Sequence, residues 1–326
     1  MKLGIGSGMN ISMNAKSFST IQSEFSILFD GSNDYMKTGG DSSTKPTAAL
    51  TVSAWVNMDT ADGGYGWPNP DGNSDHNQFI VGCIASGGYA LYIGYAGTAA
   101  NPYTYVGANA RVTDNGGGVA NKYFSDGYYN VSDDGYETTA GNAGLTSSGT
   151  TDGAPAIKGC TWGGYTSSTG YTLHDIRNLT GWNHIAMTYY AGVLKLYVNG
   201  ALKRTADSGT SSSNNISYNS NSAAEVMVGA DLGSIPSGGY DFLDGLIDDV
   251  AIWSSAVSAA GIAQIYNAGP VGTTFTESSG DYSNHLSLEA WWRFDAGEGT
   301  SVTDNSTNSN HGTLVNGPTW STITAG

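Results

Sequence analysis

Two adjacent aspartates inside an apolar strand pattern constrain this chain more than any other feature. Residues 245–253 read Gly-Leu-Ile-Asp-Asp-Val-Ala-Ile-Trp, so apolar side chains surround Asp248 and Asp249. A short apolar run of this kind is typical of a buried β-strand. A carboxylate that leaves water needs a compensating partner. The run therefore predicts a strand whose acids are paired with groups from elsewhere in the chain.

A short helix is predicted directly after this strand. Ser258 can cap its first turn, and the helix is expected from about Ser258 to Tyr266. Gly269 and Pro270 follow, and these two residues together stop helices.

Period-two alternation of apolar and polar residues recurs along the chain and predicts further strands. These strands are expected at residues 25–29, 50–56, 185–189, 194–198 and 225–229. Ala191-Gly192 and Asn199-Gly200 are two-residue turn signals that would join neighbouring strands as hairpins.

Five motifs, taken in their order along the chain, resemble the laminin G-like family of the concanavalin A-like lectin and glucanase superfamily. They are the segments 29–35, 50–56, 182–189, 196–200 and 245–267. The resemblance covers roughly residues 25 to 268. It implies an all-β fold, a two-sheet antiparallel jelly-roll sandwich with a long loop-rich insertion and one short helix.

Three parts are expected along the chain. Residues 1–24 are predicted to form an N-terminal arm, and residues 25–270 the sandwich. The insertion, about 59–180, is rich in Gly, Asn, Tyr, Ser and Thr, and we expect much of it to be ordered decoration on one end or face of the sandwich. Residues 271–326 are too few for a core of their own. They are expected to complete a sandwich, either in the same chain or in a neighbouring subunit.

The charge balance argues against two classes of partner. The formal net charge is −16 and only 12% of residues are charged, which disfavours binding to nucleic acid or to an anionic membrane. No apolar run approaches the roughly 18 residues of a membrane span, so membrane insertion is not expected. Cys83 and Cys160 are the two cysteines, and the sequence leaves open whether they form a disulfide or remain free thiols.

The expected location follows from the first residues and the composition. Residues 1–8 lack a continuous apolar segment of the kind that export signals contain. Similar Gly, Ser and Thr-rich laminin G-like chains occur in structural proteins of tailed phages. We therefore expect a virion protein that becomes extracellular when the host lyses, with other virion subunits or copies of itself as partners.

Catalytic residues are not predicted. Retaining glycoside hydrolysis needs two carboxylates about 5 Å apart, which on one strand requires acids at alternate positions. Asp248 and Asp249 are adjacent and would point to opposite faces. The six glutamates, at positions 24, 137, 225, 277, 289 and 298, do not supply the glucanase motif. His184 is interpreted as a packed core histidine.

Calcium is the predicted ion, in a structural role. It takes six to eight oxygen ligands from carboxylates, carbonyls and amides, and residues 30–34 form a compact acid-and-amide turn. The family resemblance places this turn near the strand of Asp248, so Asp30, Asp34 and Asp248 would be the ligands. The alternative is that Asp30 and Asp34 bond backbone amides in the turn, while Asp248 pairs with a hydroxyl or an arginine.

Carbohydrate recognition would use aromatic rings and hydrogen-bonding side chains, because sugars present both C–H patches and hydroxyls. The insertion supplies many such residues. The predicted ligand-binding residues are Trp67, Tyr103, Tyr105, Tyr128, Tyr129, Trp162 and Tyr165. The same residue types also suit protein interfaces, and aromatic residues often anchor loops to a sheet.

These observations favour a non-enzymatic virion adhesion protein, a fibre or decoration subunit that binds host-surface glycan. A purely structural virion assembly protein without glycan binding is the alternative, and a glycoside hydrolase is the third hypothesis.

Overall fold

The computed structural model describes a subset of the chain. The described residues are 23–39, 43–58, 77–83, 88–98, 101–113, 121–126, 165–166, 172–173, 181–207, 215–216, 218, 225–230, 242–270 and 274–325. Within several of these strands, including β7, β8, β9 and the outer parts of β5 and β6, the backbone is described without the side chains.

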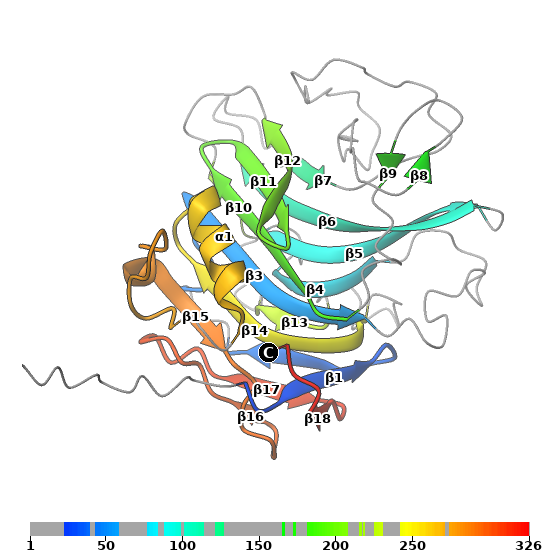
Figure 1. Ribbon diagram of the computed structural model, residues 1–326, viewed down its shortest axis with the longest axis vertical. Helices are drawn as coiled ribbons and strands as arrows, with labels where there is room; N and C mark the ends of the chain where they lie inside the picture. Colours follow the sequence, from blue (N-terminus) through cyan, green and yellow to red (C-terminus); the bar gives the residue numbers. More distant parts are fainter. Residues whose placement is uncertain are drawn as a thin grey trace, which may run out of the picture.

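Two antiparallel sheets form the body of the molecule (Figure 1). The first, sheet A, has the order β12 (Ala201–Asp207), β11 (Val193–Val198), β10 (Asn183–Tyr190), β3 (Ala49–Met58), β14 (Asp244–Trp253), β1 (Ser26–Asp30) and β18 (Thr319–Ser321), and β15 (Leu288–Trp292) also pairs with β14. The second, sheet B, has the order β16 (Ser301–Val302), β17 (Gly312–Val315), β2 (Tyr35–Thr38), β13 (Met227–Val228), β4 (Asn77–Cys83), β5 (Tyr89–Thr98), β6 (Asn101–Thr113) and β7 (Asn121–Asp126). A separate pair joins β8 (Tyr165–Thr166) to β9 (Thr172–Leu173). The predicted fold class, a two-sheet antiparallel sandwich with one α-helix, is confirmed.

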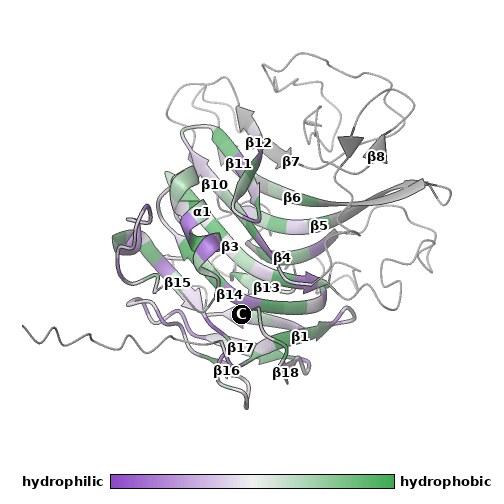
Figure 2. Cartoon of the chain, viewed as in Figure 1, coloured by the Kyte–Doolittle hydropathy of each residue, from purple (hydrophilic) through white to green (hydrophobic). Residues whose placement is uncertain are grey.

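The main core lies between the facing surfaces of the two sheets. Ile27 and Phe29 of β1 are fully buried in it, whereas Leu28 between them is exposed. This is the alternation that a strand imposes on its side chains. Figure 2 shows the resulting apolar bands along the central strands.

Both predicted hairpin turns are present. Ala191 and Gly192 have positive φ angles of 50° and 84°, and they join β10 to β11. Asn199 and Gly200 have φ angles of 50° and 73°, and they join β11 to β12. Positive φ at both central residues is the geometry that suits the right-handed twist of paired strands.

Part of the predicted insertion belongs to the core, which corrects the expectation that it decorates the sandwich. Strands β4, β5, β6 and β7 make up half of sheet B. Side chains from three of them, including Ile80, Ile93 and Val106, are buried in the main core. The segments 78–81 and 89–95 of the insertion read as strands in the sequence, and they lie in β4 and β5. Their place in sheet B follows only from the assembled fold.

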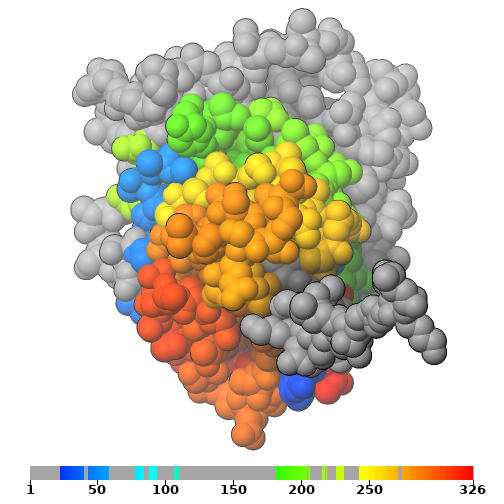
Figure 3. All heavy atoms as spheres, turned by 60° about the vertical axis from the view of Figure 1, so that its left-hand side comes forward, coloured from blue at the N-terminus to red at the C-terminus, as the bar shows by residue number. Residues whose placement is uncertain are grey.

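A second apolar layer covers the outer face of sheet A. Helix α1 (Ala259–Ala268) has Ser258 as its N-cap, whose side chain accepts a hydrogen bond from the Gly261 N–H, and Gly269 as its C-cap. Ile262 and Ile265 of α1 pack with Trp253 and Phe275 in a cluster outside the sheet. Figure 3 shows α1 in yellow beside the following segment in orange on this face. Within the described ranges, no helix has both the length and the apolar character that crossing a bilayer requires.

The C-terminal segment completes both sheets of its own chain. Strand β15 pairs with β14, and β18 pairs with β1 in sheet A. In sheet B, β17 pairs with β2 and with β16. The sequence left open whether this segment acts in the same chain or in a neighbour, and the pairing is within one chain.

Strand β14 changes partner halfway along its length. Residues 244–247 pair with β1, and residues 250–253 pair with β15. On its other side, the register with β3 shifts between Asp248 and Ala251, and Asp249 has a φ of 45°. The two predicted buried aspartates therefore lie in a β-bulge, at the junction where β14 pairs with neither β1 nor β15.

Candidate functional site

The acidic turn between β1 and β2 brings two of the predicted calcium ligands together. Asp30 Oδ1 accepts a hydrogen bond of 2.9 Å from the Ser32 N–H, which is an Asx-type contact. Asp34 is only 4% exposed. Burial, followed by the negative charge of Asp30, raises the pKa of the Asp34 carboxyl above its ordinary value.

The third predicted ligand lies elsewhere. Asp30 is paired with Asp244 across β1 and β14, so Asp248 stands four positions further along β14. That separation corresponds to about 13 Å at the rise of an antiparallel strand. Among the described residues, no group of three or more His, Cys, Asp or Glu side chains is arranged to hold a metal ion. The predicted set of three is thus not assembled, and calcium binding at the turn of Asp30 and Asp34 stays a prediction.

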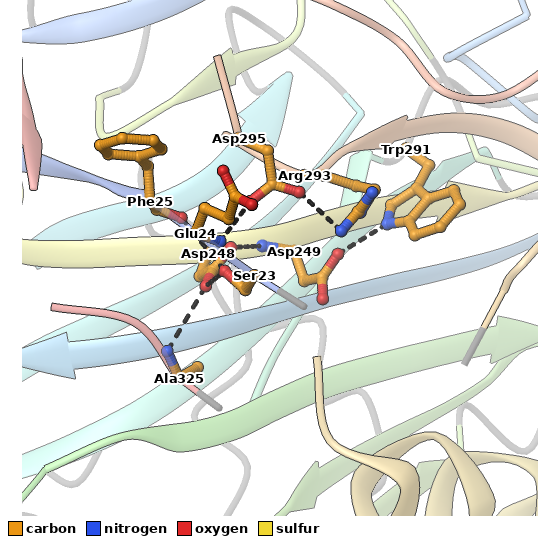
Figure 4. Close-up of polar contacts among 9 residues, drawn as sticks. All are labelled: Ser23, Glu24, Phe25, Asp248, Asp249, Trp291, Arg293, Asp295 and Ala325. Atoms are coloured by element: carbon orange, nitrogen blue, oxygen red, sulfur yellow. Dashed lines mark hydrogen bonds and ion pairs between the residues drawn. The ribbon is translucent and has the colours of Figure 1, made fainter. Parts of the chain in front are cut away.

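Asp248 is instead bonded at the junction between β1 and β15 (Figure 4). Its Oδ2 accepts a hydrogen bond of 2.7 Å from the Ser23 hydroxyl and one of 3.5 Å from the Ala325 N–H. Its Oδ1 accepts one of 2.8 Å from the Asp249 N–H. This carboxylate accepts hydrogen bonds from backbone and side-chain donors at the point where β14 pairs with neither β1 nor β15. A hydroxyl partner for Asp248 agrees with the alternative that the sequence left open.

Asp249 points to the other strand at the junction. Its Oδ1 accepts a hydrogen bond of 2.7 Å from the indole Nε1–H of Trp291. The Arg293 guanidinium lies 5.6 Å from the ring centroid of Trp291 and forms an ion pair of 2.6 Å with Asp295. The guanidinium is thus held by the indole ring on one side and by the Asp295 carboxylate on the other.

The contacts close into a ring. Asp295 Oδ1 accepts a hydrogen bond of 2.9 Å from the Glu24 N–H, and Glu24 is next to Ser23. The members of the ring, here called the carboxylate junction, come from the start of the described chain, from β14 and from the end of β15 (Figure 4). They are Ser23, Glu24, Asp248, Asp249, Trp291, Arg293 and Asp295.

Burial sets the protonation of the junction. Burial is the main cause that raises the pKa of Asp248 to about 7. The hydrogen bond from Ser23 has the opposite effect and lowers this pKa. Burial and the charge of Asp248 raise the pKa of Asp249 well above its ordinary value. Two neighbouring acids in a dry site cannot both ionise cheaply. The pair therefore gives up its second proton only at a higher pH than two separate, solvated carboxyl groups would.

The junction can hold and release protons, but it offers no surface for a substrate. Asp248 is 0% and Asp249 is 2% exposed, and Ser23, Ala325 and Trp291 contact their carboxyl groups. Their chemistry is that of a structural, titratable contact between distant segments.

His184 is a core histidine, as predicted. Its Nε2 lies 2.7 Å from the Ser53 Oγ, and its ring is 5.3 Å from that of Trp55. Burial lowers the pKa of His184 to about 3, so the imidazole is neutral at physiological pH. Cys83 is buried in the main core, and Cys160 lies outside the described residues.

The predicted ligand-binding aromatic residues fall into two groups. Trp67, Tyr128, Tyr129 and Trp162 lie outside the described residues. Tyr103 and Tyr105 lie in β6 and Tyr165 in β8, where only the backbone is described.

Sequence reasoning missed several partners of the aspartate pair. The run around Asp248 and Asp249 indicated that partners must exist, but Ser23, Arg293 and Asp295 carry no local pattern that marks them. The separation between Ser23 and Asp248 is 225 residues, and contacts at such distances follow only from the assembled sheets.

Comparison with known proteins agrees with this architecture. Residues 129–263 match the model of a laminin G family described as the concanavalin A-like lectin/glucanases superfamily. Among curated proteins, no match was found. Within the described chain, the matched stretch includes β10, β11, β14 and the start of α1.

Several solved structures are similar at low sequence identity. A candidate carbohydrate-binding protein from Bacteroides ovatus has 17% identity and a TM-score of 0.47, over 93% of this chain and 61% of that protein. This chain thus spans less than two thirds of that relative.

A heptameric pentraxin from Limulus polyphemus has 12% identity and a TM-score of 0.38, over 88% of this chain and 97% of the pentraxin. Domains LG4-5 of the mouse laminin α1 chain have 11% identity and a TM-score of 0.34, over 73% of this chain and 45% of theirs. The described strands form a concanavalin A-like jelly-roll sandwich, and residues 129–263 carry the match to the concanavalin A-like lectin/glucanases superfamily.

Proposed function

We propose that this chain is a non-enzymatic adhesion protein that binds host-surface carbohydrate, as a fibre or decoration subunit of a virus particle. The observation that carries the glycan-binding part is the match of residues 129–263 to a superfamily of lectins and glucanases. Lectins bind sugars and glucanases hydrolyse them. The arrangement of the acidic residues in the described part of the chain is more consistent with sugar binding than with hydrolysis.

The burial of the perturbed carboxylates supports the non-enzymatic part. A glycosidase needs two carboxyl groups that flank a bound sugar. Asp248 and Asp249, the carboxyl groups with the largest pKa changes among the described residues, are buried and in contact with Ser23, Ala325 and Trp291. They cannot reach a polysaccharide while these contacts are in place.

The virion setting extends the family resemblance. In this setting the protein becomes extracellular at host lysis, and its partners are other virion subunits or further copies of the chain. The net charge of −16 suits a neutral ligand such as a glycan better than a polyanion. Calcium at the turn of Asp30 and Asp34 would have a structural role.

Glycan binding is tested with the purified full chain. We expect selective binding on a glycan array and on host cells, and we expect the double variant Tyr103→Ala/Tyr105→Ala to weaken it at least tenfold. Stacked aromatic rings commonly contribute this much to ligand binding. Tyr190→Ala is the control, because it removes a tyrosine ring that is 62% exposed at the end of β10 and lies outside the predicted set. Equal binding by the double variant and the wild type would move the site elsewhere, and no binding to any glycan or cell would reject the adhesion role.

An assembly protein without glycan binding is the second candidate, and one exposed side chain favours it. Leu286 is 91% exposed, in the 3-10 helix His285–Ser287. The loop around it is fixed by bonds from Asn284 Nδ2 to Ser255 Oγ and from the Ser254 N–H to the Ser287 carbonyl, 2.7 Å and 2.8 Å long. Because this loop is already ordered, a protein partner that covered Leu286 would have a smaller entropy cost of binding.

The second candidate predicts a different defect. Leu286→Ser would lower the yield of assembled particles or multimers and leave glycan binding unchanged. Normal assembly of this variant, together with glycan binding by the wild type, would reject the second candidate and support the adhesion proposal.

A further inference from the structure

Helix α1 lies between two different segments on the outer face of sheet A. The side chain of Gln264, in the middle of the helix, lies beside Gly280 of the segment that follows the helix. At the C-terminal end of the helix, the Tyr266 ring lies beside Gly200, in the turn between β11 and β12. Figure 3 shows the three parts on one face, with the β10–β12 region in green, α1 in yellow and the following segment in orange.

The segment that follows the helix is acidic. Glu277 and Asp281 are exposed, and no Lys or Arg occurs between residues 254 and 292. Leu286 is 91% exposed, and a hydrogen bond of 2.9 Å between Ser278 Oγ and His285 Nδ1 ties its turn to the same loop. Glu277, Asp281 and Leu286 are here called the acidic corner.

The hairpin at the other end of the helix is basic. Tyr197 of β11 packs in the apolar cluster outside sheet A, so Lys195, two positions away, lies on the same face. Leu202 is paired with Tyr197 and is 47% exposed, and Lys203 next to it is also exposed. No Asp or Glu occurs between residues 176 and 206. Lys195, Leu202 and Lys203 are here called the basic corner, which contrasts with the net charge of −16 of the whole chain.

The helix between the two corners carries no charge. Its sequence is AAGIAQIYNA, and Ala259, Ala260 and Asn267 are exposed. A second protein surface could approach α1 without burying an ionised group, which would be costly. The charges of this face are therefore confined to its two ends.

This arrangement is complementary to itself. When two copies face each other across a twofold axis, each patch meets the counterpart of a different patch on the other copy. An axis that passes through the middle of α1 makes the two helices antiparallel. The acidic corner of each copy then lies opposite the basic corner of the other, and both opposite-charge contacts form at once.

We propose that the chain forms a symmetric dimer through the outer face of sheet A, with the two α1 helices antiparallel and each acidic corner against the basic corner of the other copy. Leu286 of one copy lies near Leu202 of the other, so each charged contact has an apolar centre. The proposal rests on the assembly candidate of the proposed function and names its partner as a second copy of this chain. Glycan binding does not depend on it.

Sedimentation velocity of the full chain at several protein concentrations tests the proposal. We expect a monomer–dimer equilibrium at about 0.1 M salt that weakens at about 1 M salt, because salt screens exposed charges. Lys203→Glu and Asp281→Lys should each raise the dissociation constant of the dimer at least about tenfold, since each reversal places two like-charge contacts in the symmetric dimer.

A mixture of the two variants separates a lost contact from a lost fold. Lys203→Glu makes the basic corner more acidic, and Asp281→Lys makes the acidic corner more basic. An equimolar mixture should therefore form heterodimers at concentrations where each variant alone is monomeric. Lys37→Glu is the matched control, because it makes the same charge reversal in sheet B, at the ion pair with Glu225, and should dimerise as the wild type does.

Three results would overturn the proposal. They are a wild type that stays monomeric, a dimer that neither reversal weakens, and a mixture of weakened variants that does not associate. A glycan array with the same variants keeps the two questions apart, because sugar binding should be equal in Lys203→Glu and the wild type whether or not the dimer forms. Multimers that persist in both variants but are lost in Leu286→Ser would keep the assembly candidate and reject this dimer.

Discussion

The indole N–H of Trp291 donates a 2.7 Å hydrogen bond to the Oδ1 of Asp249. Through this bond, a strand from the C-terminal segment supplies a partner to an acid that is buried in the middle of sheet A. The contact joins the family-matched part of the chain to a segment outside the match, so the two parts are expected to fold as one cooperative unit.

Removal of this donor should destabilise the protein. Trp291→Phe keeps an aromatic ring but leaves the buried Asp249 oxygen without its indole partner, which costs about 1–3 kcal/mol of unfolding free energy. Urea denaturation followed by circular dichroism measures the loss. Trp320→Phe is the control, since its N–H donates to Gly299 in an exposed setting, and its cost should stay below about 1 kcal/mol. Equal losses of unfolding free energy in the two variants would show that the buried hydrogen bond contributes no more to stability than the exposed one.

Global stability should depend on pH through Asp248. Because burial raises the pKa of this carboxyl in the folded state, its contribution is most favourable at acid pH and is lost as pH rises towards about 7. Asp248→Asn should therefore gain in unfolding free energy relative to the wild type as pH is raised from 4.5 to 7.5. Paired urea titrations at several pH values provide the comparison. A constant difference between the two proteins would contradict the assigned direction.

Calcium should stabilise the protein through the acidic turn alone. Burial and, after it, the negative charge of Asp30 raise the pKa of Asp34. A cation at the turn would offset this like charge, and ligand binding to the folded state raises the melting temperature. Scanning calorimetry with millimolar calcium and with chelator measures the effect. The double variant Asp30→Asn/Asp34→Asn should lose the calcium response, whereas Asp248→Asn should keep it. A wild type that melts at one temperature in both conditions rules out the metal.

The apolar layer outside sheet A should contribute to the unfolding free energy as a well-packed core does. Phe275 is buried, with its ring 4.9 Å from that of Trp291 and 5.1 Å from that of Trp253. Phe275→Ala should cost about 3–5 kcal/mol, because it removes a large buried side chain and leaves a cavity. Leu286→Ala, at a neighbouring exposed position, should change stability by less than about 0.5 kcal/mol. A small loss for Phe275→Ala in denaturant titrations would mean that this layer is loosely packed.

Alanine substitutions at two glycines with positive φ should distinguish the cost of backbone strain from the cost of steric overlap. Gly88 and Gly299 have φ angles of 91° and 77°. A Cβ at Gly88 would overlap the carbonyl oxygen of Cys83, whereas nothing lies within 4 Å of a Cβ at Gly299. Gly299→Ala should cost about 1 kcal/mol from its backbone conformation. Gly88→Ala should cost several times more or prevent folding, as measured by thermal denaturation and soluble yield. Similar costs for both would show that the backbone near Cys83 adjusts freely.

Local patterns in the sequence predicted the elements whose physics is local. The alternation at residues 25–29, 50–56 and 245–253 corresponds to β1, β3 and β14, and Ser258 caps α1 as expected. The turn at Asn199-Gly200 follows from residues that tolerate positive φ. Strand period, capping and turn geometry depend on neighbours only a few positions away, so a single sequence is sufficient to find them.

The sequence by itself therefore determined an all-β sandwich with one capped helix and a strand whose two acids need partners. Tertiary structure alone decided which partners those are. The pairing of β1 with β14 places Asp248 away from Asp30, and Asp248 contacts Ser23 instead. Strands β4 to β7 and the C-terminal strands belong to the two sheets. Pairing between segments far apart is selected by the packing of the whole core, because many strand registers satisfy the same alternation and only one buries all the apolar faces together.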